Sequence, residues 1–264
     1  MRKKIGIICL ICAFILTILM VALYGKHFLD YIKSDIEYQK IEDANTSDGE
    51  DSDEVEALLL GIDHVKNEYA PIDVDSENLL KQNKDYIGWI YVPKTDISYP
   101  VVKSSDNEDY LHVDFNKNYS FPGTIFMDCR CDDELLNHHI VLYGHNMNNG
   151  SMFAGLKSFR DQSYVDEHPV FWFITPEEKL LYKIFSVCNA DPYDRKQYGI
   201  DGDDFKTTEE FASAIKYMKD NSVVKIDTDE VEDTDYIMSL STCTGNSSVR
   251  CIVHGVQIGS LSCD

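Results

Sequence analysis

The sequence predicts a mainly β fold, either a closed barrel or a sandwich, preceded by helices. From Tyr86 onward the chain consists of short runs of β-branched and aromatic residues separated by Pro, Asp, Gly and Asn. This pattern is typical of many short strands joined by turns. Before that point, a long uncharged run and apolar residues at helical spacing indicate helices instead. A length of 264 residues suits one such domain with appendages.

The N-terminus predicts a membrane anchor. A basic flank at residues 2–4 precedes an uncharged run of 20 residues, Ile5 to Tyr24, which is about the length that spans a bilayer as a helix. A signal peptide has a shorter apolar region of roughly 7–15 residues, and no small-x-small cleavage site follows this run. We therefore expect a cytoplasmic tail of residues 1–4, a single transmembrane helix over residues 5–24, and the remaining chain outside the cell.

Residues 25–78 are expected to form a juxtamembrane helix and an acidic linker. Apolar residues at helical spacing predict the helix over residues 25–41. Residues 42–56 carry eight acidic and no basic side chains, which indicates a solvated linker. The spacing of these acidic residues is not that of an EF-hand, so no cation site is expected there. A further helix is expected within residues 54–68, and the main domain is expected from residue 79 to the C-terminus.

The main domain is expected to contain nine strands and a helix late in the chain, besides the helix start near Ser151. The strands are expected at residues 87–92, 97–102, 123–127, 139–143, 171–174, 179–190, 223–226, 236–242 and 249–258. The helix is expected over Thr208 to Asn221, because Phe211, Ile215 and Met218 fall on one helical stripe. Thr207 or Thr208 is the expected N-cap.

Composition argues against a nucleic-acid-binding protein. The chain has 24 basic and 46 acidic residues, for a formal net charge of −22. Nucleic-acid binding needs a basic surface. Acidity of this kind mainly promotes solubility, and it mildly favours basic partners.

The cysteines outside the predicted anchor indicate neither a metal site nor an assignable disulfide. Cys129 and Cys131 lie near His138 and His139, but the Cys-x-Cys spacing fits no strong zinc pattern. A loop with incidental cysteines is therefore expected, with no metal. An extracellular location allows a disulfide from this pair to the cysteines nearer the C-terminus, and the sequence does not select one.

Cys243 is a candidate nucleophile at the end of a predicted strand. The turn after it is rich in Gly, Asn and Ser, and a second β-prone run begins at Val249. If the turn centres between Asn246 and Ser247, Cys243 lies opposite Arg250, and opposed residues have Cβ atoms about 5 Å apart. A guanidinium at that distance favours a thiolate and can hold an oxyanion. The alternative, a small buried apolar cysteine, stays open at this point.

His145 is the candidate acid and base. It follows a short apolar strand and precedes a loop, with a helix start expected near Ser151. Together with Cys243 and Arg250 it supplies a nucleophile, a proton carrier and an anion stabiliser. His254 is a rival base, because it shares the face of Arg250 by period-2 counting. The other histidines, among them His112, have no supporting pattern.

Several ordered segments resemble the sortase family, and class B sortases in particular. Ser239 to Cys243 resembles the sortase Leu-x-Thr-Cys strand end, with Arg250 on the next strand, and Tyr143 to Met147 resembles the histidine segment. The class B likeness comes from residues 85–90, 97–102 and 123–128, and the resemblance runs from about Leu79 to about Ile258.

The resemblance implies a closed β-barrel of about eight strands with a helix between strands six and seven. It also implies a membrane-anchored cysteine transpeptidase of Gram-positive bacteria that needs no cofactor. Cys243, His145 and Arg250 would be its catalytic residues. Its partners would be surface proteins with a C-terminal sorting motif, cleaved after Thr, and an amine of a peptidoglycan precursor that accepts the acyl group.

Contacts with substrate are expected from Ser241, Thr242 and Asn146. Two departures from the family are visible: Thr244 stands where some class B members have Asp, and the segment from Cys243 to Arg250 is short. The recognised pentapeptide, of an Asn-Pro-x-Thr-x or Pro-x-Thr-Gly type, stays open, as does the acceptor amine.

Two other classes of function remain as alternatives. A papain-like cysteine protease would hydrolyse its substrate, but in that class the Cys precedes the His, which is the reverse of the order here. A catalytically silent surface binding module would have no need of an intact Cys, His and Arg.

Overall fold

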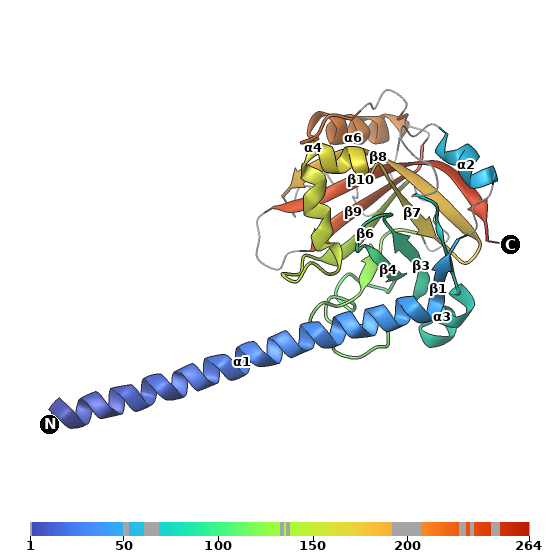
Figure 1. Cartoon of the computed structure of the whole chain (residues 1–264). Helices are drawn as coiled ribbons and strands as arrows, with labels where there is room; N and C mark the ends of the chain where they lie inside the picture. Colours follow the sequence, from blue (N-terminus) through green and yellow to red (C-terminus); the bar gives the residue numbers. More distant parts are fainter. Residues whose placement is uncertain are drawn as a thin grey trace.

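The computed structural model describes residues 2–49, 53–60, 69–132, 135, 138–191, 207–226, 231–232, 235–243 and 249–263. Its main body is a closed barrel with strand order β10-β8-β7-β3-β4-β5-β6-β9 (Figure 1). The barrel strands are β3 (Tyr86–Tyr91), β4 (Ser98–Val102), β5 (Ile125–Met127), β6 (His139–His145), β7 (Val170–Ile174), β8 (Glu178–Ala190), β9 (Ile237–Cys243) and β10 (Arg250–Ser262).

The barrel confirms the predicted fold class. Large apolar side chains fill the core, among them Trp89 and Trp172, which are fully buried. The pairs β4–β5 and β6–β9 are parallel, and the other barrel pairs are antiparallel. The parallel β6–β9 pair matters most for the site, because it joins two strands that lie far apart in the sequence.

One predicted strand, residues 223–226, is wrong. After the helix α6, the chain makes an isolated bridge to β8, between Ser222 and Cys188, and the Val223 N–H donates to the Val187 carbonyl oxygen, but residues 223–226 form no strand. Val224 is buried against the core. Val224 and the partly buried Ile226 therefore reflect packing on the core and not a strand, while Val223 is exposed.

The helix between the sixth and seventh barrel strands is confirmed. It is α6 (Thr208–Asp220), which lies between β8 and β9, and the Thr207 side chain caps it by accepting from the Glu210 N–H. Phe211, Ile215 and Met218 are buried in one cluster with Ile237 of β9 and Val256 of β10. The helix start expected near Ser151 is a 3₁₀ helix, η1 (Phe153–Arg160), followed by α4 (Gln162–Glu167).

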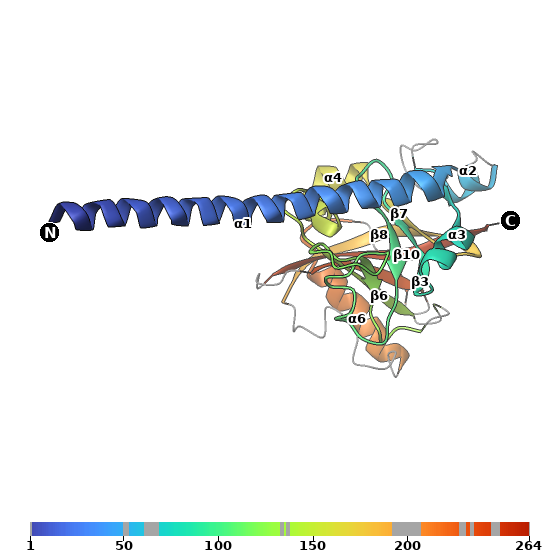
Figure 2. The same cartoon turned by 90° about the horizontal axis from the view of Figure 1, so that it is seen from below.

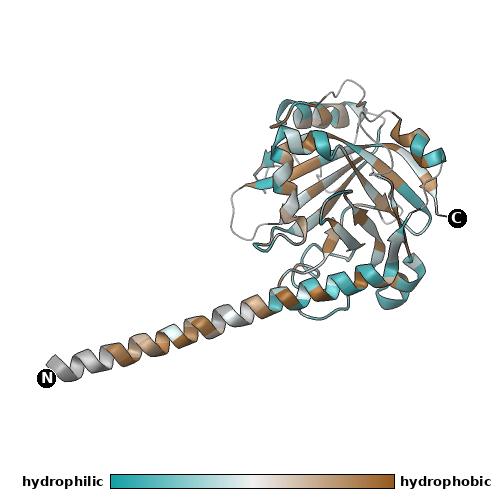
Figure 3. Ribbon diagram, in the orientation of Figure 1, coloured by the Kyte–Doolittle hydropathy of each residue, from teal (hydrophilic) through white to brown (hydrophobic). Residues whose placement is uncertain are grey.

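The N-terminal helix α1 (Arg2–Asn45) is continuous over 44 residues. Its C-terminal part packs on the barrel through the buried side chains of Tyr38 and Ile41. Its N-terminal part projects away from the barrel, and α1 and α6 lie on opposite sides of the barrel (Figures 1 and 2). The described residues of the projecting part are mostly hydrophobic (Figure 3). Among the described residues, no helix is both long enough and apolar enough to cross a membrane.

The acidic segment after α1 is not a plain solvated linker, so that prediction is wrong in part. Thr46–Asp48 forms β1, which pairs antiparallel with β2 (Ile72–Val74). Helix α2 (Asp53–Leu59) then buries Val55 and Leu59 against the barrel. The backbone pairing of β1 with β2 and the burial of Val55 and Leu59 order this segment despite its negative charge. The rest of the helix expected within residues 54–68 falls largely outside the described residues, and α3 (Ser76–Gln82) leads into the barrel.

Candidate active site

Three neighbouring strands bring the predicted catalytic residues into one row. In the parallel β6–β9 pair, His145 is the register partner of Cys243. In the antiparallel β9–β10 pair, Ile252 is opposite Ser241, and the same register carried two residues further places Arg250 opposite Cys243. On this register Cys243 lies in the middle, with His145 on one strand beside it and Arg250 on the other.

Gly144 explains why the His145 side chain lies on the face of β6 away from the core. A Cβ at Gly144 would come within 2.4 Å of Ile125 Cδ1 and 2.7 Å of the Phe153 ring, so the core packs directly against the backbone there. Side chains alternate along a strand. His145 therefore points to the opposite face of β6, away from this core, where it is only partly buried.

The His145 ring is held by a backbone carbonyl. Nε2 lies 2.9 Å from the Leu111 carbonyl oxygen, and because a carbonyl only accepts, Nε2 carries a hydrogen in both protonation states. The nitrogen that exchanges a proton is therefore Nδ1. Burial lowers the pKa of His145 below its ordinary value, and the positive charges of His112 and Arg250 act in the same direction. The hydrogen bond to Leu111 opposes them.

Two buried polar atoms beside this row have no hydrogen-bond partner within the described part of the chain. They are Nε of Arg250 and Oδ1 of Asn146, the residue after His145. Buried polar atoms are nearly always paired. The arrangement is therefore open to completion by a bound peptide or by residues beyond the described ranges. The substrate contact of Asn146 stays a prediction.

Comparison with known proteins identifies the family. The sortase domain model matches residues 90–258. The chain belongs to the sortase family, and within it to class B. Sortase B of Staphylococcus aureus (strain NCTC 8325 / PS 47) is 35% identical over 170 residues, which are 63% of this chain and 66% of that protein, a little under two thirds of its length.

Two solved structures show the same likeness over more of the fold. The crystal structure of sortase B from B. anthracis in complex with AAEK1 has a TM-score of 0.69 and 30% identity, covering 87% of this chain and 98% of that one. The X-ray structure of Clostridium perfringens sortase B has a TM-score of 0.64 and 33% identity, covering 69% of this chain and 99% of that one.

The structure adds two residues to this sortase site that sequence reasoning missed. Leu111 supplies the carbonyl that holds His145, and the His112 ring stacks on the His145 ring. Both come from the irregular segment between β4 and β5, which has no periodicity to follow. No signal in the sequence points to them, because a backbone carbonyl carries no residue preference and His112 stands in no motif.

The other residues predicted around the site are buried. Ser241 and Thr242 are almost fully buried, and the Thr242 hydroxyl accepts from the Cys251 N–H at 3.1 Å. Their contact with substrate stays a prediction. His254 is fully buried and its register partner is Ser239, four residues before Cys243. It is therefore outside the row and unsuited to the role of rival base.

The cysteine and histidine clusters give no further site within the described ranges. Cys129, Cys131, Cys188, Cys251 and Cys263 are free thiols. No group of three His, Cys, Asp or Glu side chains among the described residues is arranged to hold a metal ion.

Proposed function

We propose that this chain is a cysteine transpeptidase that cleaves a C-terminal sorting signal after Thr and joins the new carboxyl end to an amine. The observation that carries the proposal is the row of His145, Cys243 and Arg250 across β6, β9 and β10. It sits in a sortase-family barrel. A nucleophile flanked by an acid/base and a fixed cation is the arrangement that acyl transfer requires.

The first half-reaction forms a thioester. Nδ1 of His145 takes the Cys243 thiol proton as the sulfur attacks the Thr carbonyl, and a tetrahedral oxyanion forms. Arg250 stabilises that negative charge. The lowered pKa of His145 makes its imidazolium a stronger acid. Nδ1–H then donates the proton to the leaving amine, the C–N bond breaks, and the acyl group remains on Cys243.

The second half-reaction releases the product. An acceptor amine, proposed to belong to a peptidoglycan precursor, attacks the thioester carbonyl while Nδ1 of His145 takes its proton. The C–S bond then breaks, and the proton returns to the Cys243 sulfur. Water in place of the amine would make the chain a hydrolase, so the experiment must separate these outcomes.

We also propose that the chain is anchored in the cell membrane by its N-terminus, with the barrel outside the cell and surface proteins as its substrates. The support for the anchor is the uncharged run from Ile5 to Tyr24 behind a basic flank. The direction of α1 away from the barrel agrees with it (Figure 1). The test is alkaline extraction of membranes from expressing cells. The full chain should stay in the pellet, and a chain that begins at Phe28 should not.

The catalytic proposal is tested with the full chain in detergent and a library of fluorogenic sorting peptides, with and without an amine. Intact-mass spectrometry should show an acyl adduct that an amine converts to a ligated product, and Cys243→Ala should show neither. Cleavage that is indifferent to the amine would indicate a hydrolase. A folded chain that forms no adduct with any peptide would indicate a binding module.

A further inference from the structure

His112 lies directly against the proposed acid/base. The ring centroids of His112 and His145 are 5.4 Å apart and the ring planes differ by 21°. The preceding residue, Leu111, gives its carbonyl oxygen to His145 Nε2 at 2.9 Å. Two consecutive residues therefore contact one imidazole, one at its edge and one on its face. These contacts limit rotation of the ring about both of its side-chain torsions.

His112 is itself held by further contacts. Its Nδ1 donates to the Phe121 carbonyl oxygen at 2.9 Å, and its ring stacks on the Phe121 ring with centroids 5.6 Å apart and planes at 18°. Phe121 also stacks on the His145 ring, with centroids 6.4 Å apart and planes at 22°, and Tyr31 of α1 meets Phe121 edge-on, at 5.9 Å and 88°. The contacts therefore run from α1 through Phe121 to His145, both directly and by way of His112.

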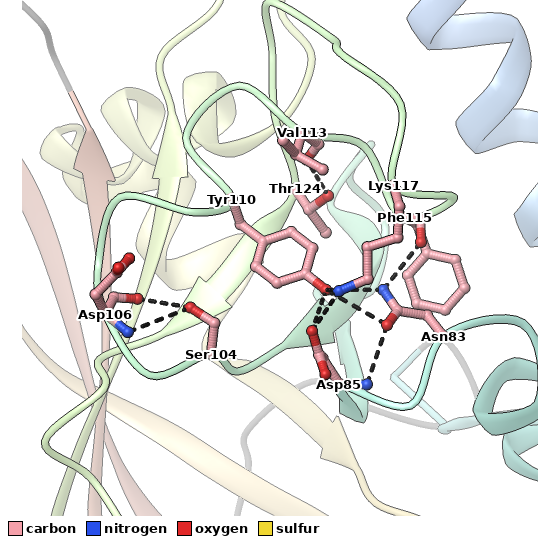
Figure 4. A network of polar contacts seen from close by, with 9 residues as sticks. All are labelled: Asn83, Asp85, Ser104, Asp106, Tyr110, Val113, Phe115, Lys117 and Thr124. Carbon is pink, nitrogen blue, oxygen red and sulfur yellow. Dashed lines mark hydrogen bonds and ion pairs between the residues drawn. The ribbon is translucent and has the colours of Figure 1, made fainter.

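The segment that carries these residues is braced by a network of polar contacts, of which the Asn83–Tyr110 bond is buried (Figure 4). The Tyr110 hydroxyl donates to Asp85 Oδ2 at 2.7 Å and accepts from Asn83 Nδ2 at 3.0 Å, and Lys117 contacts both Asp85 and Tyr110. Tyr110 immediately precedes the two residues that touch His145. The position of the carbonyl and of the stacked ring is therefore fixed by the barrel and not by an unsupported loop.

We propose that His112 is a positioning residue for His145, whose stacked ring keeps Nδ1 of His145 directed at the row of Cys243 and Arg250. The proposal rests on the proposed acid/base function of His145. A ring free to rotate about its Cβ–Cγ bond would spend part of its time with Nδ1 turned away. Misplacement of a reacting group by about 1 Å can cost a hundredfold in rate.

His112 also faces His145 as a titratable group. The charged groups that act on His145 are His112 from the β4–β5 segment and Arg250 from β10. The register partner of His145 is Cys243 on β9. Protonated His112 and Arg250 repel a second positive charge on His145. The aromatic neighbours Phe121 and Tyr119 bring no charge to the His112 side. Replacing His112 should therefore change the titration of His145 as well as its orientation.

The first readout is the titration of His145, followed by NMR of the ring Cε1–H signals in the full chain in detergent. His112→Ala removes a positive neighbour and admits water, so the pKa of His145 should rise. His112→Phe keeps a stacked ring without charge, so the pKa should rise by less. This readout does not depend on turnover, and it stays interpretable if the proposed transpeptidase activity fails.

The second readout is kcat/KM for peptide ligation across pH. His112→Ala should lower it about tenfold or more, and His112→Phe should stay near the parent chain at its optimum. The matched control is His138→Ala, since His138 also stacks on an aromatic ring, Tyr236, at 5.0 Å, with Nδ1 bonded to a backbone carbonyl at 3.2 Å. That variant should move neither readout. An unchanged His145 titration in His112→Ala would overturn the proposal, whatever happens to kcat/KM.

Discussion

At the scale of single residues, the position of the His145 ring depends on a glycine that does not touch it. Gly123 has φ +62°, and a Cβ there would lie 2.4 Å from the Tyr110 carbonyl oxygen and 2.5 Å from that of Leu111. The Leu111 oxygen is the acceptor for His145 Nε2. A side chain at Gly123 would have to push this acceptor aside.

Gly123→Ala should therefore reduce both stability and acylation. We expect a cost of about 2 kcal/mol or more, from the left-handed backbone and the clash together, and a slower formation of the acyl adduct. The matched control is Gly150→Ala, because Gly150 also has positive φ, +95°, but no atom within 4 Å of the added Cβ. Gly150→Ala should lower the free energy of unfolding only through the left-handed backbone conformation, by about 1 kcal/mol. Urea denaturation and single-turnover acylation measure the two effects, and equal values for the two variants would contradict the argument.

Arg250 should contribute both charge and geometry, and two substitutions separate these. Arg250→Lys keeps the charge but loses the planar fork, so acylation should slow by roughly 10²–10³, as for loss of an oxyanion donor. Arg250→Ala should slow it at least as much. Only Arg250→Ala should raise the pKa of His145, because it removes a positive charge that now lowers it. A rapid-quench measurement of adduct formation with an NMR titration decides this, and full activity in Arg250→Lys would count against an oxyanion role.

At the scale of elements, β6, β9 and β10 carry a second polar row, formed by His139, Ser239 and His254 and separate from the catalytic row. His139 Nε2 lies 2.7 Å from the Ser239 hydroxyl, which lies 2.6 Å from His254 Nδ1. The hydroxyl can donate to one ring and accept from the other. All three side chains are buried, so this row links the three strands within the wall and does not meet substrate.

The second row should make the fold sensitive to acid. Burial lowers the pKa of His139 to about 4 and that of His254 to about 3, below the ordinary value near 6.5. The folded chain therefore keeps both rings neutral where the unfolded chain binds protons. The contribution of the two neutral rings to the free energy of unfolding is fully present above about pH 6.5. It falls as the pH drops toward 4, by up to about 1.4 kcal/mol per pH unit for each ring.

His254→Gln tests the direction of this pH dependence, because it keeps a polar partner for Ser239 but cannot titrate. Its free energy of unfolding, measured by urea denaturation between pH 7 and 4.5, should fall less steeply than that of the parent chain. The acidic residues of the surface contribute equally to both curves, so the difference isolates His254. Parallel curves would contradict the argument, because they would show that His254 binds a proton as readily in the folded chain as in the unfolded chain.

The same strands show what the sequence could and could not predict. The pairing of Cys243 with Arg250 could be predicted by counting residues through the turn, because the turn is short and side chains alternate with period 2 along a strand. The approach of His145 depends on parallel pairing of β6 with β9 across many intervening residues, and only the family resemblance predicted it. Leu111 and His112 were missed because an irregular segment brings them in, and the strand at residues 46–48 was missed because charge suggested a linker.

At the scale of the whole molecule, α1 is part of the folded unit and not only a tether. Beyond the contact of Tyr31, the Tyr38 hydroxyl donates to the Gly123 carbonyl oxygen at 2.7 Å, and Asn149 in the segment after His145 donates to Asp35 at 2.8 Å. The barrel-proximal half of α1 therefore contacts both the β4–β5 segment and the segment after His145. If the proposed anchor is present, this helix would couple anchoring to the geometry of the site.

Two truncations test this coupling. A chain that begins at Phe28 keeps every contact of α1 with the barrel named above, so its melting temperature and acylation rate should match those of the full chain. A chain that begins at Asp75 loses them, together with the β1–β2 pair and helix α2. We expect a loss of several kcal/mol, lowering the melting temperature by roughly 5–15 °C, because Tyr38 and Ile41 leave a gap on the barrel. Acylation should also slow, as in His112→Ala, since Phe121 loses its support from Tyr31.

Calorimetry and single-turnover acylation, run well below the lower melting temperature, measure both effects. Equal acylation rates for the two truncated chains would show that α1 stabilises the barrel without acting on the catalytic row.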